Sequence, residues 1–122
     1  MKKPSFVTLV SGGSYAQREA AIAAAILTYP PAETKAVILE GLPDGNGMLP
    51  SDPSLQLQRI APGCMCCIGN LVMRVTLNRL LRHPPERLYL SLASAGHLEN
   101  ILQFFQQVPY SELLTVDQDI RI

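Results

Sequence analysis

This sequence has little charge of either sign and no run of like charge. Only 16% of its 122 residues are charged, with ten basic residues balancing ten acidic ones, whereas an average soluble domain is about a quarter charged. The densest basic group is Arg74, Arg79 and Arg82, which are spread along one predicted helix, so we expect no nucleic-acid partner. A surface this poor in charge favours association, and a homodimer is one expectation.

Long apolar runs are also lacking. Residues 1–13 carry two lysines and a short apolar stretch that ends at Ser11 and two glycines, a pattern unlike a signal peptide and too short for a membrane span. We therefore expect a cytoplasmic protein that does not contact a membrane. The length fits one domain, residues 1–122. Its last predicted strand has no closing helix, which predicts a fragment of a longer protein or an edge that another chain covers.

Cysteine is absent except at Cys64, Cys66 and Cys67. Three thiols so close together do not make a disulfide framework, because neighbours in sequence pair only with strain, and this agrees with a reducing compartment. Redox sensing and simple space filling are possible uses of such thiols. A metal site is the third, because soft thiolates at the start of a predicted helix, where the dipole favours the thiolate, suit a thiophilic ion.

Zinc requires four ligands, so three cysteines leave one position open. Glu40, at the end of the second predicted strand, and His97, at the end of the fourth, are the candidate donors from this chain, because parallel strands deliver their carboxyl ends to one edge of the sheet. Water or a ligand from a partner is the alternative. Cu(I) would accept two or three thiolates alone. An open position suits transfer of the ion better than a permanent structural site.

Apolar periodicity predicts an α/β fold. Strands are predicted at 5–13, 35–41, 55–61, 87–94 and 112–122, helices at 15–27, 70–83 and 95–108, and a loop at 42–54. Strands that alternate with helices indicate βαβ crossovers and a mostly parallel sheet with helices on both faces, a three-layer arrangement.

The turn after the first predicted strand, SGGSYAQREA, lies where parallel sheets often bind phosphates. The candidate phosphate-binding residues are Gly12, Gly13, Ser14 and Arg18. A phosphate-binding loop requires Gly-x-x-x-x-Gly-Lys-[Ser/Thr], and here Gln17, Arg18 and Glu19 stand at its last three positions. Arg18 keeps a positive charge, whereas Gln17 and Glu19 oppose phosphate binding. The alternative is a turn that only reverses the chain, with Ser14 capping the helix or Ser11 satisfying the loop.

With a glycine turn after the first strand and GCMCC after the third, the sequence resembles the CobW-like metallochaperone GTPases, relatives of the urease and hydrogenase nickel-insertion GTPases. The Gly-Cys-x-Cys-Cys element is specific to that family. Further matches are FVTLVSGG, AVILEG, NLVMRVTLNRLL, LYLSLASAGHLENI and LLTVDQ. The resemblance implies a P-loop NTPase-like fold and a role in handling zinc, cobalt or a related metal for a client metalloprotein.

Three nucleotide-binding elements depart from the family pattern. Residues 17–19 replace Gly-Lys-Thr, residues 40–43 replace Asn-Glu-Phe-Gly, and residues 93–96 lack the acidic residue of the family's switch. We therefore predict a zinc-binding, metallochaperone-related domain with a degenerate phosphate loop, a pseudo-GTPase rather than an enzyme. The alternatives are a noncanonical GTPase that uses GTP and Mg²⁺, and a non-catalytic interaction scaffold.

Overall fold

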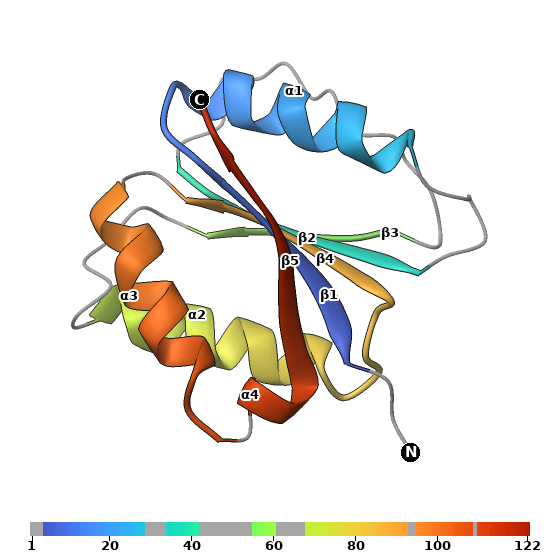
Figure 1. Cartoon of the computed structure of the whole chain (residues 1–122), viewed down its shortest axis with the longest axis vertical. Coiled ribbons are helices and arrows are strands. Elements are labelled where there is room, and N and C mark those ends of the chain that lie inside the picture. Colours follow the sequence, from blue (N-terminus) through green and yellow to red (C-terminus); the bar gives the residue numbers. More distant parts are fainter. Residues whose placement is uncertain (1–3, 29–33, 42–54, 61–67, 93–94, 109) are drawn as a thin grey trace.

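A computed structural model of the chain shows a parallel sheet between two layers of helices (Figure 1). It describes residues 4–28, 34–41, 55–60, 68–92, 95–108 and 110–122, with the backbone alone at 68–72 and 95–98. The elements are β1 (Ser5–Ser11), α1 (Tyr15–Ile26), β2 (Lys35–Glu40), β3 (Leu55–Ile60), α2 (Ile68–Leu80), β4 (Arg87–Leu92), α3 (Ala95–Phe105), α4 (Tyr110–Leu113) and β5 (Leu114–Arg121).

The strand order is β3-β2-β4-β1-β5, and every adjacent pair is parallel. Helix α1 covers one face of the sheet, and α2 and α3 cover the other (Figure 1). Because both faces are covered, β2 is buried at all six positions and β4 at five of six. The predicted α/β class and the three-layer, P-loop-like arrangement are thus confirmed, and the sheet is entirely parallel within the described residues.

Side-chain alternation along the strands divides the core between the two faces. The cluster on the α1 face consists of Val10, Ile22, Ile26, Val37, Leu39 and Tyr89. The larger cluster, on the face of α2 and α3, includes Val7, Leu9, Ile38, Met73, Leu77, Leu90, Ile101 and Phe104. Successive residues of β1, such as Leu9 and Val10, therefore serve opposite faces, as the period of two in a strand requires.

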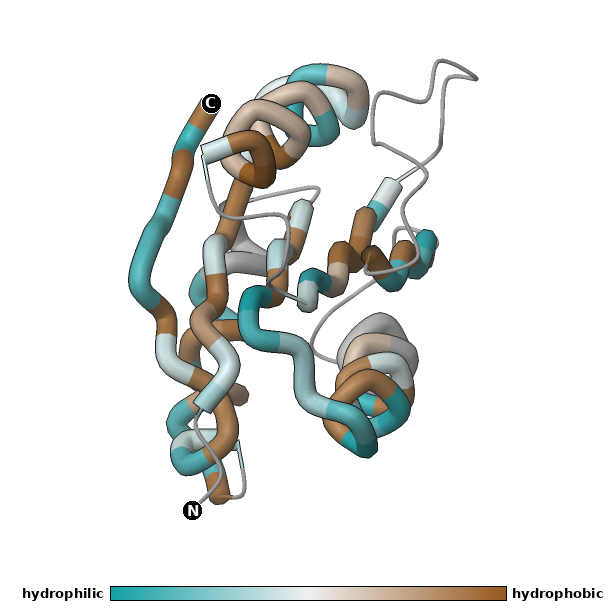
Figure 2. Tube along the Cα trace, turned by 90° about the vertical axis from the view of Figure 1, so that its right-hand side faces the viewer, coloured by the Kyte–Doolittle hydropathy of each residue, from teal (hydrophilic) through white to brown (hydrophobic). Residues whose placement is uncertain are grey.

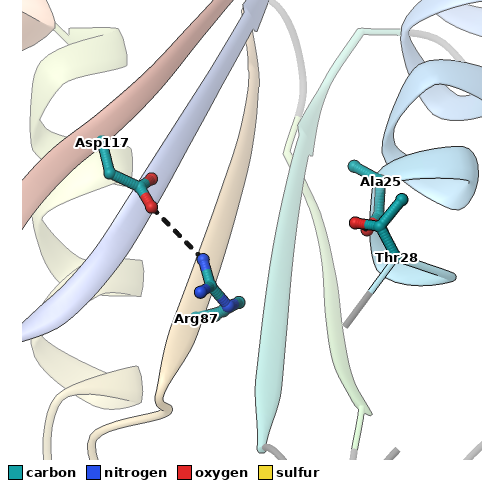
Figure 3. A network of polar contacts seen from close by, with 4 residues as sticks. All are labelled: Ala25, Thr28, Arg87 and Asp117. Carbon is teal, nitrogen blue, oxygen red and sulfur yellow. Dashed lines mark hydrogen bonds and ion pairs between the residues drawn. The ribbon is translucent and has the colours of Figure 1, made fainter. Parts of the chain in front are cut away.

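Strand β5 forms an edge of the sheet, and its middle residues 117–119 are a hydrophilic run (Figure 2). Its register with β1 shifts between Val7 and Thr8, which leaves Asp117 without a partner in the ladder. Arg87 of β4 reaches across β1 to Asp117, with 3.3 Å between Nη1 and Oδ2 (Figure 3). The Arg87 guanidinium carbon also lies 5.6 Å from the ring centre of Phe6. This interaction joins three strands at the end of the sheet opposite the glycine turn.

The predicted elements are present, but their ends differ. Helix α4 occupies the start of the predicted last strand, because Tyr110 packs on Phe104, with 4.4 Å between ring centres, and its hydroxyl donates to Asn78 Oδ1 at 2.6 Å. These tertiary contacts hold the turn in helical form. Helix α2 begins at Ile68 rather than residue 70, and α2 and α3 end about a turn before their predicted limits. The predicted loop 42–54 lies outside the described residues.

Candidate functional site at the carboxyl edge of the sheet

The glycine turn follows β1 at the edge where β2 and β4 also end. Gly12 and Gly13 have φ values of 85° and 60°, a left-handed backbone that favours glycine. Ser14 then caps α1: its Oγ accepts from Gln17 N at 3.1 Å, and Gln17 Oε1 accepts from Ser14 N at 2.8 Å. Ser14 is therefore the N-cap that the sequence predicts. Its backbone N–H, a natural donor to an anion, is bonded to Gln17.

The side chain of Arg18 packs against this turn and is buried, with 3% of the residue's surface exposed. Its Nε donates to Ser91 Oγ of β4 at 2.8 Å, and its Nη2 donates to the carbonyl of Glu40 at the end of β2 at 3.1 Å. Its Nη1 donates to the carbonyls of Gly12 and Gly13 at 3.2 and 3.0 Å. We call these five residues, Arg18, Gly12, Gly13, Glu40 and Ser91, the arginine cluster.

The arginine cluster is tightly packed where β2 ends. Glu40 is 1% exposed, and Gly41 follows it with φ at 139°. A Cβ at Gly41 would lie 2.8 Å from the ring of Tyr15 and 3.2 Å from Arg18 Nη2, so only glycine fits there. Burial lowers the pKa of Arg18, and its electrostatic interactions with Glu40 and Tyr15 act in the opposite direction. The cluster therefore compensates for the burial of a cation.

Glu19, the residue at the last position of the phosphate-loop pattern, contacts strand β3. Its side chain is buried, and its Oε1 lies 3.5 Å from Nη2 of the half-exposed Arg59 on β3. This contact joins α1 to the strand that precedes the three cysteines in sequence. Glu19 thus has a structural partner on β3.

The end of β5 lies against the glycine turn. Ile122 N donates to the carbonyl of Ser11 at 2.8 Å, and a Cβ placed on Gly12 would be 2.5 Å from the carbonyl oxygen of Ile122. A Cβ on Gly13 would lie 2.5 Å from Gln17 Oε1 and 2.8 Å from a methyl group of Ile122. Both glycines are therefore closely covered by other parts of the chain.

The predicted metal ligands are placed only in part. Cys64, Cys66 and Cys67 lie outside the described residues, and for His97 the structure gives the backbone, on the first turn of α3. Glu40 pairs with Ile60, the last residue of β3, and Gly41 N donates to the Ile60 carbonyl at 3.1 Å. Over the described part of the chain, no group of three or more His, Cys, Asp or Glu residues could hold a metal.

Sequence reasoning missed Ser91 and the carbonyl groups that surround Arg18. Ser91 is fully buried, and the signal for it was a polar residue inside the apolar strand pattern RLYLSL. A buried hydroxyl requires a hydrogen-bond partner, but the pattern does not identify that partner. The structure brings together the four predicted phosphate-binding residues Gly12, Gly13, Ser14 and Arg18. Their binding of phosphate stays a prediction.

Comparison with known proteins gives a partial match. No family model matches the chain, and no solved structure matches it. The chain is similar to the zinc chaperone YeiR of Escherichia coli strain K12, with 39% identity over 66 residues, which are 53% of this chain and 20% of that protein. The matched part thus spans about one fifth of the length of this curated relative. None of the helices in the described ranges is long and apolar enough to cross a membrane. The match agrees with the resemblance to the CobW-like proteins.

Proposed function

We propose that this chain is a metallochaperone-related domain of the CobW-like type that binds zinc through Cys64, Cys66 and Cys67. The similarity to a zinc chaperone carries the proposal, together with the GCMCC motif that stands in sequence between β3 and α2. Parallel strands deliver their carboxyl ends to one edge of the sheet, and loops at this edge are the usual ligand sites of such folds. In sequence the cysteines follow β3, and β3 ends at that edge.

The donor set fits zinc as a cargo ion. Thiolates are ligands that zinc prefers, and three of them leave one coordination position for a fourth donor or for a client protein. Glu40 is the best candidate in this chain, because it pairs with Ile60 and thus lies at the end of β2 next to the strand that leads to the cysteines. His97, on the first turn of α3, is the alternative donor. A client metalloprotein would accept the ion by replacing that fourth ligand.

Native mass spectrometry of freshly purified, reduced protein tests the proposal. We expect about one zinc ion per chain, and none in the variant with Cys64→Ser, Cys66→Ser and Cys67→Ser. Met65→Ser is the matched control, because it changes the same motif without removing a thiol, and it should keep the zinc. If the triple variant binds zinc as tightly as the wild-type chain, the cysteines are not the ligands and the proposal is wrong.

The fourth ligand is tested separately by competition with a chromogenic chelator. Glu40→Gln and His97→Gln are compared with the wild-type chain at one pH, and circular dichroism confirms that each variant is folded. Loss of the true fourth ligand should weaken zinc binding by about tenfold or more, whereas the other variant should leave it unchanged. Equal affinities in all three chains would exclude both residues and leave water or a partner as the fourth donor.

A further inference from the structure

We infer that the Arg18 guanidinium occupies the phosphate position of this fold and holds the ends of β1, β2 and β4 together without a nucleotide. Crevices at the carboxyl edge of a parallel sheet are the usual place for a nucleotide's phosphates. Here the side chain of the protein itself fills the edge beside the glycine turn. This role of Arg18 does not require zinc binding by the cysteines.

The glycine turn directs carbonyl groups toward Arg18. A phosphate site presents backbone N–H groups to an anion. In this turn the carbonyls of Gly12 and Gly13 face Arg18 Nη1, and the Ser14 N–H is bonded to Gln17 Oε1. These carbonyls, the Glu40 carbonyl and the Ser91 hydroxyl oxygen together form a ring of acceptors around Arg18. Such a ring selects a cation and repels an anion.

Arg18 is bonded to several separate parts of the chain at once. Its hydrogen bonds reach the last residue of β2, Ser91 near the end of β4 and the turn after β1, and only 3% of its surface is exposed. A planar guanidinium with several fixed donors can satisfy these separate acceptors at once, which a lysine ammonium cannot do. A bound phosphate would have to break this set of bonds, and each bond to a charged group corresponds to roughly a tenfold change or more in an equilibrium constant.

Other parts of the chain lie close against Gly12 and Gly13. Phosphate-binding glycines keep one side of the backbone open so that the ligand can approach. At Gly12 that space is taken by the Ile122 carbonyl, and at Gly13 it is taken by Gln17 and by an Ile122 methyl group. These contacts come from residues 17 and 122, outside the arginine cluster, and they lead to the same conclusion.

Chemical rescue of an Arg18→Ala variant tests this inference. The substitution removes the atoms of an ethylguanidinium and leaves its acceptors in place, so about 10 mM ethylguanidinium should bind the variant and raise its Tm. Without the additive we expect the Tm to fall by more than about 10 °C, since a buried, charged set of hydrogen bonds is lost. Ethylammonium, which has the charge but not the planar fork, should give no comparable recovery. Arg121→Ala is the matched control: its guanidinium is exposed and pairs with Asp119 at the surface, so its Tm should stay near that of the wild-type chain.

Further measurements apply if Arg18→Ala does not fold without the additive, and they test nucleotide binding directly. If Arg18→Ala is recovered as folded protein only with ethylguanidinium present, the inference is supported; if the additive has no effect there, the inference is wrong. Arg18→Lys should fold with a Tm below the wild-type value. GTP with Mg²⁺ should leave the wild-type Tm unchanged. A saturable rise in Tm with GTP and Mg²⁺, or equal Tm values for Arg18→Ala and Arg121→Ala, would overturn the inference. Neither result would bear on zinc binding by the cysteines.

Discussion

Replacing Ser91 with alanine is a direct measure of how far the buried arginine depends on its partners. Ser91 is fully buried in β4, and its hydroxyl oxygen accepts from Arg18 Nε at 2.8 Å. Alanine fits the same space but removes the acceptor. The Nε–H of a buried, charged group is then left without this partner, in a place that water does not easily reach.

The expected cost follows from the charge on the donor. Loss of a hydrogen bond to a charged group costs about 1.5 to 3 kcal/mol, which for a chain of this length lowers Tm by roughly 5 to 12 °C. Ser5→Ala is a matched comparison, because Ser5 is 1% exposed and its hydroxyl donates to the neutral carbonyl of Pro85. That loss should cost about 1 kcal/mol. Both changes remove one buried hydroxyl group, so the difference between them isolates the effect of the arginine's charge.

Urea unfolding followed by far-UV circular dichroism gives both free energies, provided that the m values of the variants agree. A double-mutant cycle with Arg18→Met adds a second test, since Ser91→Ala should cost much less once the guanidinium is absent. The reasoning is refuted if Ser91→Ala is no more destabilising than Ser5→Ala, or if the two substitutions at 18 and 91 are additive.

Three further changes test the turn and the sheet edge. Gln17→Gly removes half of the capping box and places glycine inside α1, so urea unfolding should show a free energy of unfolding lower by about 1 to 2 kcal/mol. An unchanged free energy would contradict the observed cap. Gly41→Ala should lower the free energy of unfolding by more than about 2 kcal/mol, because φ is 139° and the new methyl group would lie 2.8 Å from the Tyr15 ring. A variant as stable as the wild type would show that the backbone at Gly41 is not left-handed. Asp117→Ala removes the ion pair with Arg87 of β4, and we expect it to lower the free energy of unfolding by less than about 1 kcal/mol, and by still less in high salt. A large loss of stability that does not depend on salt would show that the pair is effectively buried.

The sequence determined the fold class and the local signals of this protein. Apolar strands that alternate along the chain with amphipathic helices predicted a mostly parallel, three-layer α/β fold. This was possible because the pattern of apolar residues in a strand or a helix depends on neighbours in sequence. The N-cap at Ser14 was also predicted, since capping depends on residues only three positions apart. The cysteine motif, and the metal site proposed for it, likewise come from the sequence and from the similarity to a zinc chaperone.

Only the tertiary structure decided what the glycine turn and Arg18 do at the edge of the sheet. From the sequence, Arg18 was a replacement for a lysine that reaches phosphates. In the fold it bonds to Ser91, 73 positions away, and to the carbonyl end of β2. Ile122 covers Gly12 because β5 pairs with β1, a neighbour that sequence order does not reveal. A long, flexible side chain can reach many acceptors, and strand order, which arises from the packing of the whole core, decides which of them lie within its reach.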